Sequence, residues 1–274
     1  MTWNRLLLVG LVLAACERPA ATPPSNAEAA RQVFGGGVEW LDLTHDFGPT
    51  TIYWPTSRAF RLERVFTGRT PAGHWYEANN IQAAEHGGTH LDAPAHFAEG
   101  GRTTDSVPLA NLIGPAVVVD VRDSAASNPD YLVSVADLER WERAHGRMPE
   151  GAIVLLRTGW AARWPDRARY LGTADTGLAA TKRLHFPGLD PAAARFLVTE
   201  RRIAAAGLDT PSIDAGPSTT FETHVVLMSA NLPAFENLAA LDRLPETGAY
   251  LVALPMKIAG GSGGPLRIVA AVPR

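Results

Sequence analysis

Short runs of β-branched and aliphatic residues, each bounded by glycine or proline, set the strongest limit on the fold. Such runs are typical of buried strands. Five of them lie in the second part of the sequence, at 116–121, 152–157, 203–208, 250–255 and 266–272. The segment KIAGGSGG lies between the last two runs, so we expect these two strands to form a hairpin or to be neighbours in one sheet.

Two helices are expected between these runs. The first covers 135–145, because Ser134 is suited to cap its first turn and Asp137 follows three residues later as a capping acid. The second begins after Asp190, with Pro191 in its first turn, and includes the segment DPAAARFLVTERR. Strands outnumber helices, so the sequence predicts a mixed α/β fold with a substantial sheet, whose strand order the pattern leaves open.

Composition excludes several classes of protein. Hydrophobic residues make up 46% of the 274 residues, which is too many for a disordered chain. The 25 Lys and Arg residues face 28 Asp and Glu residues, and this net charge of -3 argues against a nucleic-acid partner. The single cysteine excludes an internal disulfide and a zinc site built on CxxC pairs. Histidines and carboxylates would therefore have to hold any metal ion.

The first 16 residues, MTWNRLLLVGLVLAAC, are typical of a secretory signal peptide. Their apolar stretch would span about 15 Å as a helix, half of the hydrocarbon core of a bilayer. The ending LAAC resembles the lipobox of bacterial lipoproteins, which implies lipidation of Cys16; the alternative is a simple signal peptide that ends near a cysteine. Residues 17–37 fit a tether, and 38–274 fit one domain. We therefore expect an exported protein, held at the periplasm-facing membrane only by a lipid anchor.

Four potential metal ligands lie close together in the segment EHGGTHLDAPAHF, namely His86, His90, Asp92 and His96. They are separated by even numbers of residues, so an extended chain would point them to one side. The two glycines after His86 disfavour a regular helix and allow a bend that brings His86 to the others. Imidazole and carboxylate ligands suit zinc, manganese or iron. The alternative is a set of hydrogen-bonded histidines that bind no metal.

The string HGGTHLDAPAHF resembles the HxGTHxDxPxHF signature of the cyclase family of metal-dependent hydrolases, which includes bacterial kynurenine formamidases and isatin hydrolases. Three further segments support the resemblance: Tyr53-Trp54-Pro55, GLDTPSID, and a downstream block with His224 and the glutamate of FENL. The resemblance extends from about residue 42 to the C-terminus. It implies a layered β/β/α fold of the swivelling-domain type with a mixed sheet, assembled as a homodimer or homotetramer.

The resemblance also implies roles for individual residues. His86, His90 and Asp92 would be ligands of a divalent ion, zinc or manganese. Asp92 and Glu236 could bridge two ions, with His224 on the second; the alternatives are a single ion, a structural histidine at 224 and a surface acid at 236. Trp54 would contact the substrate. Further aromatic walls could come from Phe97, Trp75 and Tyr76, although the last two are equally suited to a core.

The chemistry follows from the residue types. A divalent ion brings the pKa of a bound water from 15.7 to about 7, so that hydroxide is available at neutral pH, and it polarises an amide carbonyl. The leaving amine still needs a proton. We assign that transfer to His96, because an imidazole can take a proton from water and return it to nitrogen. The alternative is that His96 is a fourth metal ligand.

These observations predict a metal-dependent amidohydrolase of the arylformamidase type, in which metal-bound hydroxide attacks a small aryl formamide or related amide. Two alternatives stay open. One is the opening of a cyclic amide, as in isatin hydrolases, because the ligand set would be the same. The other is a lipoprotein that binds a metal or a small ligand without catalysis. A pure metal binder would have no need for His96, which favours an enzyme.

Overall fold

The computed structural model describes residues 36–274. The predicted signal peptide, the lipidation site Cys16 and nearly all of the tether lie outside these residues. Within them, the strands are β1 (Val38–Asp42), β2 (Arg61–Arg69), β3 (Trp75–Gln82), β4 (His90–Asp92), β5 (Ile113–Asp120), β6 (Leu132–Val133), β7 (Ile153–Arg157), β8 (Gly188–Leu189), β9 (Ala205–Leu208), β10 (Ala234–Glu236), β11 (Tyr250–Pro255) and β12 (Gly263–Pro273).

The helices are fewer and shorter than the strands. The α-helices are α2 (Arg122–Ser127), α3 (Val135–His145), α4 (Arg167–Leu171), α5 (Pro191–Phe196) and α6 (Glu222–Ser229). A π-helical turn, Leu197–Arg201, extends α5. Short 3-10 turns cover Pro94–His96, Thr104–Ser106, Leu109–Asn111, Trp160–Arg163, Leu178–Arg183 and Leu241–Arg243. No helix among the described residues is long and apolar enough to cross a membrane.

Seven strands close into a barrel-like mixed sheet. Their order is β12-β11-β5-β7-β9-β10-β4, and β4 pairs again with β12 to close the ring, while β1 adds to the far end of β12. All five strands predicted from the sequence are present, and β11 and β12 pair antiparallel as expected. The prediction of a mixed α/β fold is confirmed.

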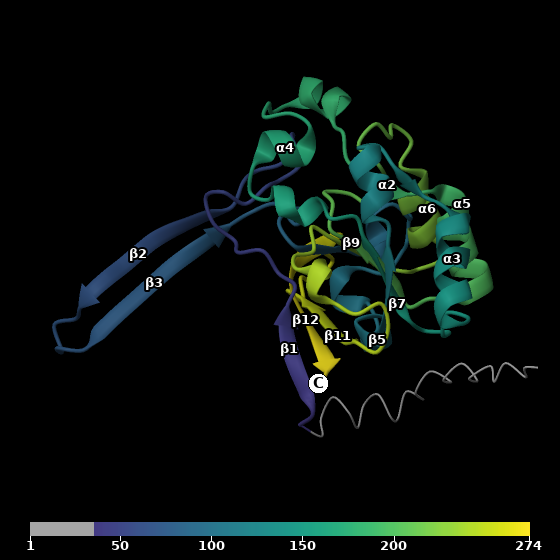
Figure 1. The fold of residues 1–274 in the computed structure, drawn as a ribbon. Helices are drawn as coiled ribbons and strands as arrows, with labels where there is room; N and C mark the ends of the chain where they lie inside the picture. The colour runs from purple at the N-terminus through teal and green to yellow at the C-terminus, as the bar shows by residue number, and fades with distance from the viewer. Residues whose placement is uncertain (1–35) are drawn as a thin grey trace, which may run out of the picture.

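Alternating side chains of the central strands divide the interior into two cores. Val118 and Leu155 point into the barrel, where they pack with apolar residues of β4, β11 and β12. Val119 and Leu156 point outward and pack against α3, α5 and α6. These helices lie together on one side of the sheet (Figure 1). Strands buried on both faces must be apolar throughout, which explains the continuous runs seen in the sequence.

Capping fixes the starts of both predicted helices. Ser134 accepts a hydrogen bond from the backbone N–H of Asp137, and the Asp137 carboxylate accepts one from the N–H of Ser134. The Asp190 side chain caps α5, and Pro191 occupies its first turn. Both helices therefore begin where the sequence predicts.

One hairpin stands apart from this body. Strands β2 and β3 pair antiparallel and project away from the barrel (Figure 1). Their two ends lead directly into segments 52–57 and 85–87, which border the main cavity described below.

The capping box of α3 predicts a pH-dependent contribution to stability. Burial disfavours the ionised form of Asp137, but hydrogen bonds from Ser134 and Tyr131 outweigh it and lower the pKa of this carboxyl. The stabilisation by ionised Asp137 is therefore fully present above the pKa of an unfolded aspartate, near 3.9. It is lost as the pH falls through the lower pKa that Asp137 has in the folded protein. We expect Asp137→Asn to reduce the free energy of unfolding by about 0.5–2 kcal/mol at pH 7, and by less at pH 3.

Urea unfolding at the two pH values checks this prediction. Asp123→Asn is the matched control, because Asp123 is exposed in the first turn of α2, and its substitution should change the free energy of unfolding by less than about 0.5 kcal/mol. An Asp137→Asn effect that is the same at pH 3 and pH 7 would contradict the assignment.

Candidate metal centre

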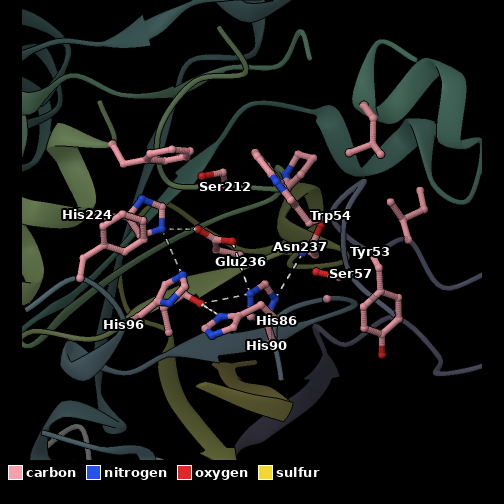
Figure 2. Close-up of a pocket in the computed structure, with 17 residues that line it drawn as sticks. Tyr53, Trp54, Ser57, His86, His90, His96, Ser212, His224, Glu236 and Asn237 are labelled. Carbon is pink, nitrogen blue, oxygen red and sulfur yellow. Dashed lines mark hydrogen bonds and ion pairs between the residues drawn. The ribbon is translucent and has the colours of Figure 1, made fainter. Parts of the chain in front are cut away.

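A cavity of about 230 Å³ opens beside the paired strands β4 and β10. It is smaller than the pockets that hold drug-sized ligands, so it suits a compact molecule. Its walls come from parts of the chain that lie far apart in the sequence (Figure 2). The lining residues are Ile52, Tyr53, Trp54, Ser57, His86, Gly87, His90, Asp92, His96, Phe97, Leu171, Pro211, Ser212, Phe221, His224, Glu236 and Asn237.

Strand register explains how residues far apart in the sequence meet beside these two strands. His90 and Asp92 lie two residues apart on β4, so their side chains point to the same face. Antiparallel pairing places Glu236 of β10 directly opposite His90. His224 reaches the same point from α6. His90, Asp92, His224 and Glu236 are only 1–4% exposed.

Two glycines turn the chain so that His86 joins this group. Gly87 and Gly88 have φ values of 152° and 58°, in the region that side chains other than glycine rarely adopt. A Cβ atom on Gly87 would lie 2.1 Å from the Tyr53 ring, so a larger residue does not fit. The bend predicted from the sequence is confirmed.

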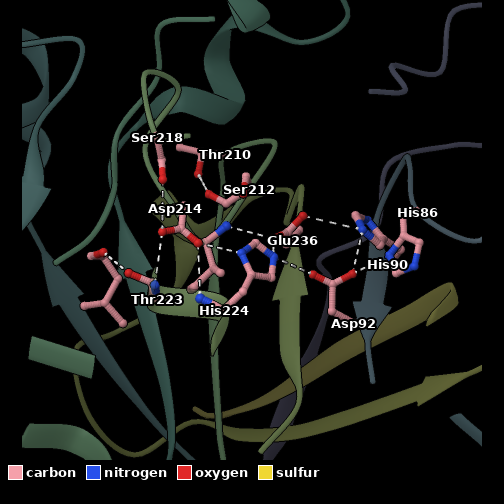
Figure 3. A network of polar contacts seen from close by, with 12 residues as sticks. His86, His90, Asp92, Thr210, Ser212, Asp214, Ser218, Thr223, His224 and Glu236 are labelled. Carbon is pink, nitrogen blue, oxygen red and sulfur yellow. Dashed lines mark hydrogen bonds and ion pairs between the residues drawn. The ribbon is translucent and has the colours of Figure 1, made fainter. Parts of the chain in front are cut away.

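The two oxygens of Asp92 divide the histidines into two groups (Figure 3). Oδ1 lies 2.6 Å from Nδ1 of His86 and 3.2 Å from Nε2 of His90. Oδ2 lies 3.2 Å from Nε2 of His224, which is also 3.3 Å from Oε1 of Glu236. Oε2 of Glu236 lies 3.5 Å from Nε2 of His90. Both carboxylates thus lie between histidine nitrogens on two sides.

The remaining nitrogen of each histidine lies beside a hydrogen-bond acceptor. His90 Nδ1 donates to the Gly88 carbonyl at 2.9 Å, and His224 Nδ1 donates to Asp214 at 2.6 Å. When the ring is neutral with its hydrogen on the outer nitrogen, the inner nitrogen of each histidine is free to bind a metal ion.

His86 is oriented through a longer chain of hydrogen bonds. The Ser262 hydroxyl donates to the Glu85 carboxylate at 2.7 Å, so its oxygen accepts from His86 Nε2 at 2.9 Å. Nδ1 is then the nitrogen that faces Asp92. Gly263 permits this arrangement, since a Cβ there would lie 2.5 Å from the imidazole.

The electrostatics of the centre favour a cation. Burial disfavours the charged form of His90, but Asp92 and Glu236 outweigh it and raise the pKa of His90 to about 9. Burial likewise opposes the charged form of His224, while Asp214, Asp92 and Glu236 raise its pKa well above the ordinary value. Burial and the neighbouring Asp92 raise the pKa of Glu236. Two buried carboxylates therefore draw positive charge to this point.

This donor set fits a divalent metal ion. The groups His86–Asp92–His96 and His90–Asp92–Glu236 each offer ligand atoms that all lie within 4.8 Å of one another. Imidazole nitrogens with free lone pairs and carboxylate oxygens, without thiolate, are the ligands of catalytic rather than structural ions. An ion would replace the protons that the buried histidines otherwise attract.

His96 is a potential ligand of the first of these groups and also faces the cavity. It belongs to the 3-10 turn that follows β4, and its ring stacks on His86 with centroids 3.8 Å apart. Burial, offset in part by Asp92, lowers the pKa of His96 to about 4, so its imidazole is neutral at pH 7. It lines the cavity and is partly exposed there.

Aromatic side chains form the outer wall of the cavity. Trp54 lies in this wall, where its ring is 6.3 Å from that of Phe221, and Phe97 lies 5.4 Å from the same ring. Trp75 and Tyr76 do not contribute: both lie on β3 in the projecting hairpin and are 62% and 51% exposed. For these two residues both the wall and the core interpretations are wrong.

Several residues of the site were not identified from the sequence. Asp214 and Ser262 accept hydrogen bonds from His224 and His86, which lie outside their own sequence segments. Phe221 belongs to no sequence motif that indicates a site. Asp214 does end the segment GLDTPSID, which resembled a family segment but gave no role for a single side chain. Asn237 follows Glu236 directly and also lines the cavity.

A family model described as "Putative cyclase" matches residues 41–215. The isatin hydrolase of Roseibium aggregatum is 33% identical over 257 residues, which cover 89% of this chain and 95% of that protein. A kynurenine formamidase of Salinibacter ruber is 28% identical over 235 residues, with 84% and 95% covered. The solved structure of isatin hydrolase A from Labrenzia aggregata, bound to benzyl benzoate, has a TM-score of 0.79 at 36% identity and covers 90% of this chain and 99% of its own.

The family model and the isatin hydrolase relative both extend over most of the chain and include the whole HGGTHLDAPAHF segment. The fold and the buried group of histidines and carboxylates agree with that match. The chain therefore belongs to the cyclase family of metal-dependent hydrolases.

Proposed function

We propose that this protein is an amidohydrolase that opens a small aryl amide at a centre of divalent metal ions. The observation that carries the proposal is the pair of buried carboxylates, Asp92 and Glu236, surrounded by three histidines at the end of an aromatic-walled cavity. His86, His90, Asp92, His224 and Glu236 would hold the metal. The two sides of Asp92 support two ions, and the imidazole and carboxylate ligands support zinc or manganese.

The protein's own residues would complete the reaction. A divalent ion bound there would activate water and polarise the amide carbonyl. His96, neutral and partly exposed beside His86, would take a proton from the attacking water and return it to the leaving nitrogen. Trp54 and Phe97 would stack against the aryl group and limit access of bulk water to the bond that breaks.

Two substrate classes fit this site. The small cavity and the greater similarity to the isatin hydrolase, 33% against 28% for the formamidase, favour a cyclic aryl amide over an open aryl formamide. Assays on isatin and on N-formylkynurenine distinguish them. A protein that binds metal yet hydrolyses neither would support the non-catalytic alternative.

The proposed location of the protein rests on the sequence alone. We propose export, lipidation at Cys16 and attachment to the periplasm-facing membrane through the tether 17–37. A homodimer or homotetramer also stays a prediction. So does the layered β/β/α arrangement, for which the helix group on one side of the closed sheet is the support (Figure 1).

Replacement of His96 separates binding from catalysis. We expect His96→Ala to retain the metal content of the wild-type protein and to lose about 10²–10⁴-fold in kcat, because proton transfer is removed while the buried ligands stay in place. Metal analysis and steady-state kinetics measure the two effects. Loss of metal in His96→Ala would instead assign His96 as a fourth ligand. Unchanged turnover would remove it from the mechanism.

Removal of the Ser262 hydroxyl tests how the centre is oriented. We expect Ser262→Ala to weaken metal affinity by about 10–100-fold, because His86 would lose the acceptor that keeps its hydrogen on Nε2. Competition with a chelator measures this affinity. Ser106→Ala is the control, since that hydroxyl donates to the carbonyl of Thr103 on the surface. Equal metal affinity in the two variants would contradict the role of Ser262.

A further inference from the structure

Asn237 is a buried polar residue to which the proposed reaction gives no role. It follows Glu236 at the end of β10 and is only 3% exposed. Neighbouring residues of a strand normally point to opposite faces, yet these two both line the cavity. Asn237 departs from the alternation because its φ is 54°, in the left-handed region that asparagine adopts more readily than most residues. Its side chain therefore faces the cavity beside His90 (Figure 2).

Hydrogen bonds on three sides hold Asn237 in this position. Its backbone N–H donates to the Thr210 carbonyl at 2.9 Å, and its carbonyl accepts from the Thr89 hydroxyl at 2.6 Å. Its amide oxygen Oδ1 accepts from the hydroxyl of Tyr170 at 3.0 Å. Tyr170 is fully buried on α4, behind the cavity wall, and the same hydroxyl also donates to the Asp209 carbonyl at 3.0 Å. Tyr170 therefore fixes which end of the amide faces the cavity.

The amide nitrogen of Asn237 is left as a donor without an acceptor. Nδ2 lies 3.4 Å from Nδ1 of His90, which already donates to the Gly88 carbonyl, so neither nitrogen accepts from the other. No other residue between 36 and 274 accepts a hydrogen bond from Nδ2. A buried N–H group without an acceptor destabilises the folded protein. An oxygen of a molecule bound in the cavity would satisfy it.

The place of the amide indicates which oxygen it would bind. Nδ1 of His90 lies across the ring from Nε2, and it is Nε2 that faces Asp92 and Glu236. Asn237 therefore lies on the far side of His90 from the two carboxylates, where it would meet the part of a substrate next to the reacting amide. No lysine or arginine is among the described residues that line the cavity. This favours a neutral carbonyl oxygen over an ionised carboxylate.

We propose that Asn237 is a specificity-determining residue, whose amide donates a hydrogen bond to a second carbonyl oxygen of the substrate, next to the amide that is opened. Tyr170 is the positioning residue that orients this donor. The inference rests on the proposed function, because it describes the substrate of the same site as a compact aryl amide with a neighbouring carbonyl.

Two ligands that differ in this oxygen test the proposal. Isatin carries a second carbonyl beside its ring amide, and oxindole carries a methylene at that position. Fast quenching of tryptophan fluorescence after mixing, before turnover, gives the dissociation constant of each ligand for the metal-loaded protein. We expect the wild-type protein to bind isatin about tenfold more tightly than oxindole.

Tyr170→Phe removes only the hydroxyl that orients the amide. We expect it to weaken isatin binding about tenfold, to leave oxindole binding within about twofold, and to retain the metal content of the wild type. Asn237→Ala should have the same effects, because it removes the donor itself. Tyr131→Phe is the matched control, since its hydroxyl donates to Asp137 away from the cavity, and both dissociation constants should keep their wild-type values.

Equal affinity of the wild-type protein for the two ligands would overturn the inference, as would an equal loss for both ligands in Tyr170→Phe and Asn237→Ala. Loss of metal in Tyr170→Phe, with an unchanged ratio of the two constants, would also overturn it and assign the amide to His90 instead. The proposed function fails separately. Isatin that binds with the expected preference but is not hydrolysed would contradict the amidohydrolase, and would still support Asn237 as the residue that recognises the second carbonyl.

Discussion

The burial of Asp92 between three histidines is the interaction on which the rest of the site depends. A carboxylate that is 1% exposed is costly unless positive charge compensates it, and Glu236 adds a second negative group at the same point. The histidines are hydrogen-bonded through their outer nitrogens, so their inner nitrogens are oriented toward the carboxylates. The centre is thus arranged to receive a cation between side chains of β4, β10 and α6.

Closure of the sheet creates this arrangement. Strand β4 is only three residues long, but it pairs with both β10 and β12 and so joins the two ends of the ring. Its alternation sends Leu91 into the apolar core and the two flanking residues into the cavity. The core that stabilises the barrel and the ligands that would hold the metal therefore share one short strand. A change in its register would displace both.

The sequence predicted the local features well. These features depend on residues that are close together in the sequence. The apolar runs predicted the five strands, the capping residues predicted both helix starts, and the HGGTHLDAPAHF segment predicted the grouping of His86, His90 and Asp92. Ser262 lies 176 residues from His86, and only the closed sheet brings the two together. Trp75 and Tyr76 illustrate the opposite limit: aromatic residues in a strand favour burial, but both are exposed on the projecting hairpin.

Anomalous X-ray diffraction from crystals of the purified protein, recorded across the zinc and manganese absorption edges, tests the central claim most directly. The account predicts an anomalous peak between Asp92, His86 and His90, about 2.0–2.2 Å from the ligand atoms if the ion is zinc. A second peak on the His224 side would establish two ions. A fully ordered site with no anomalous peak, in crystals of protein that is active in amide hydrolysis, would contradict it.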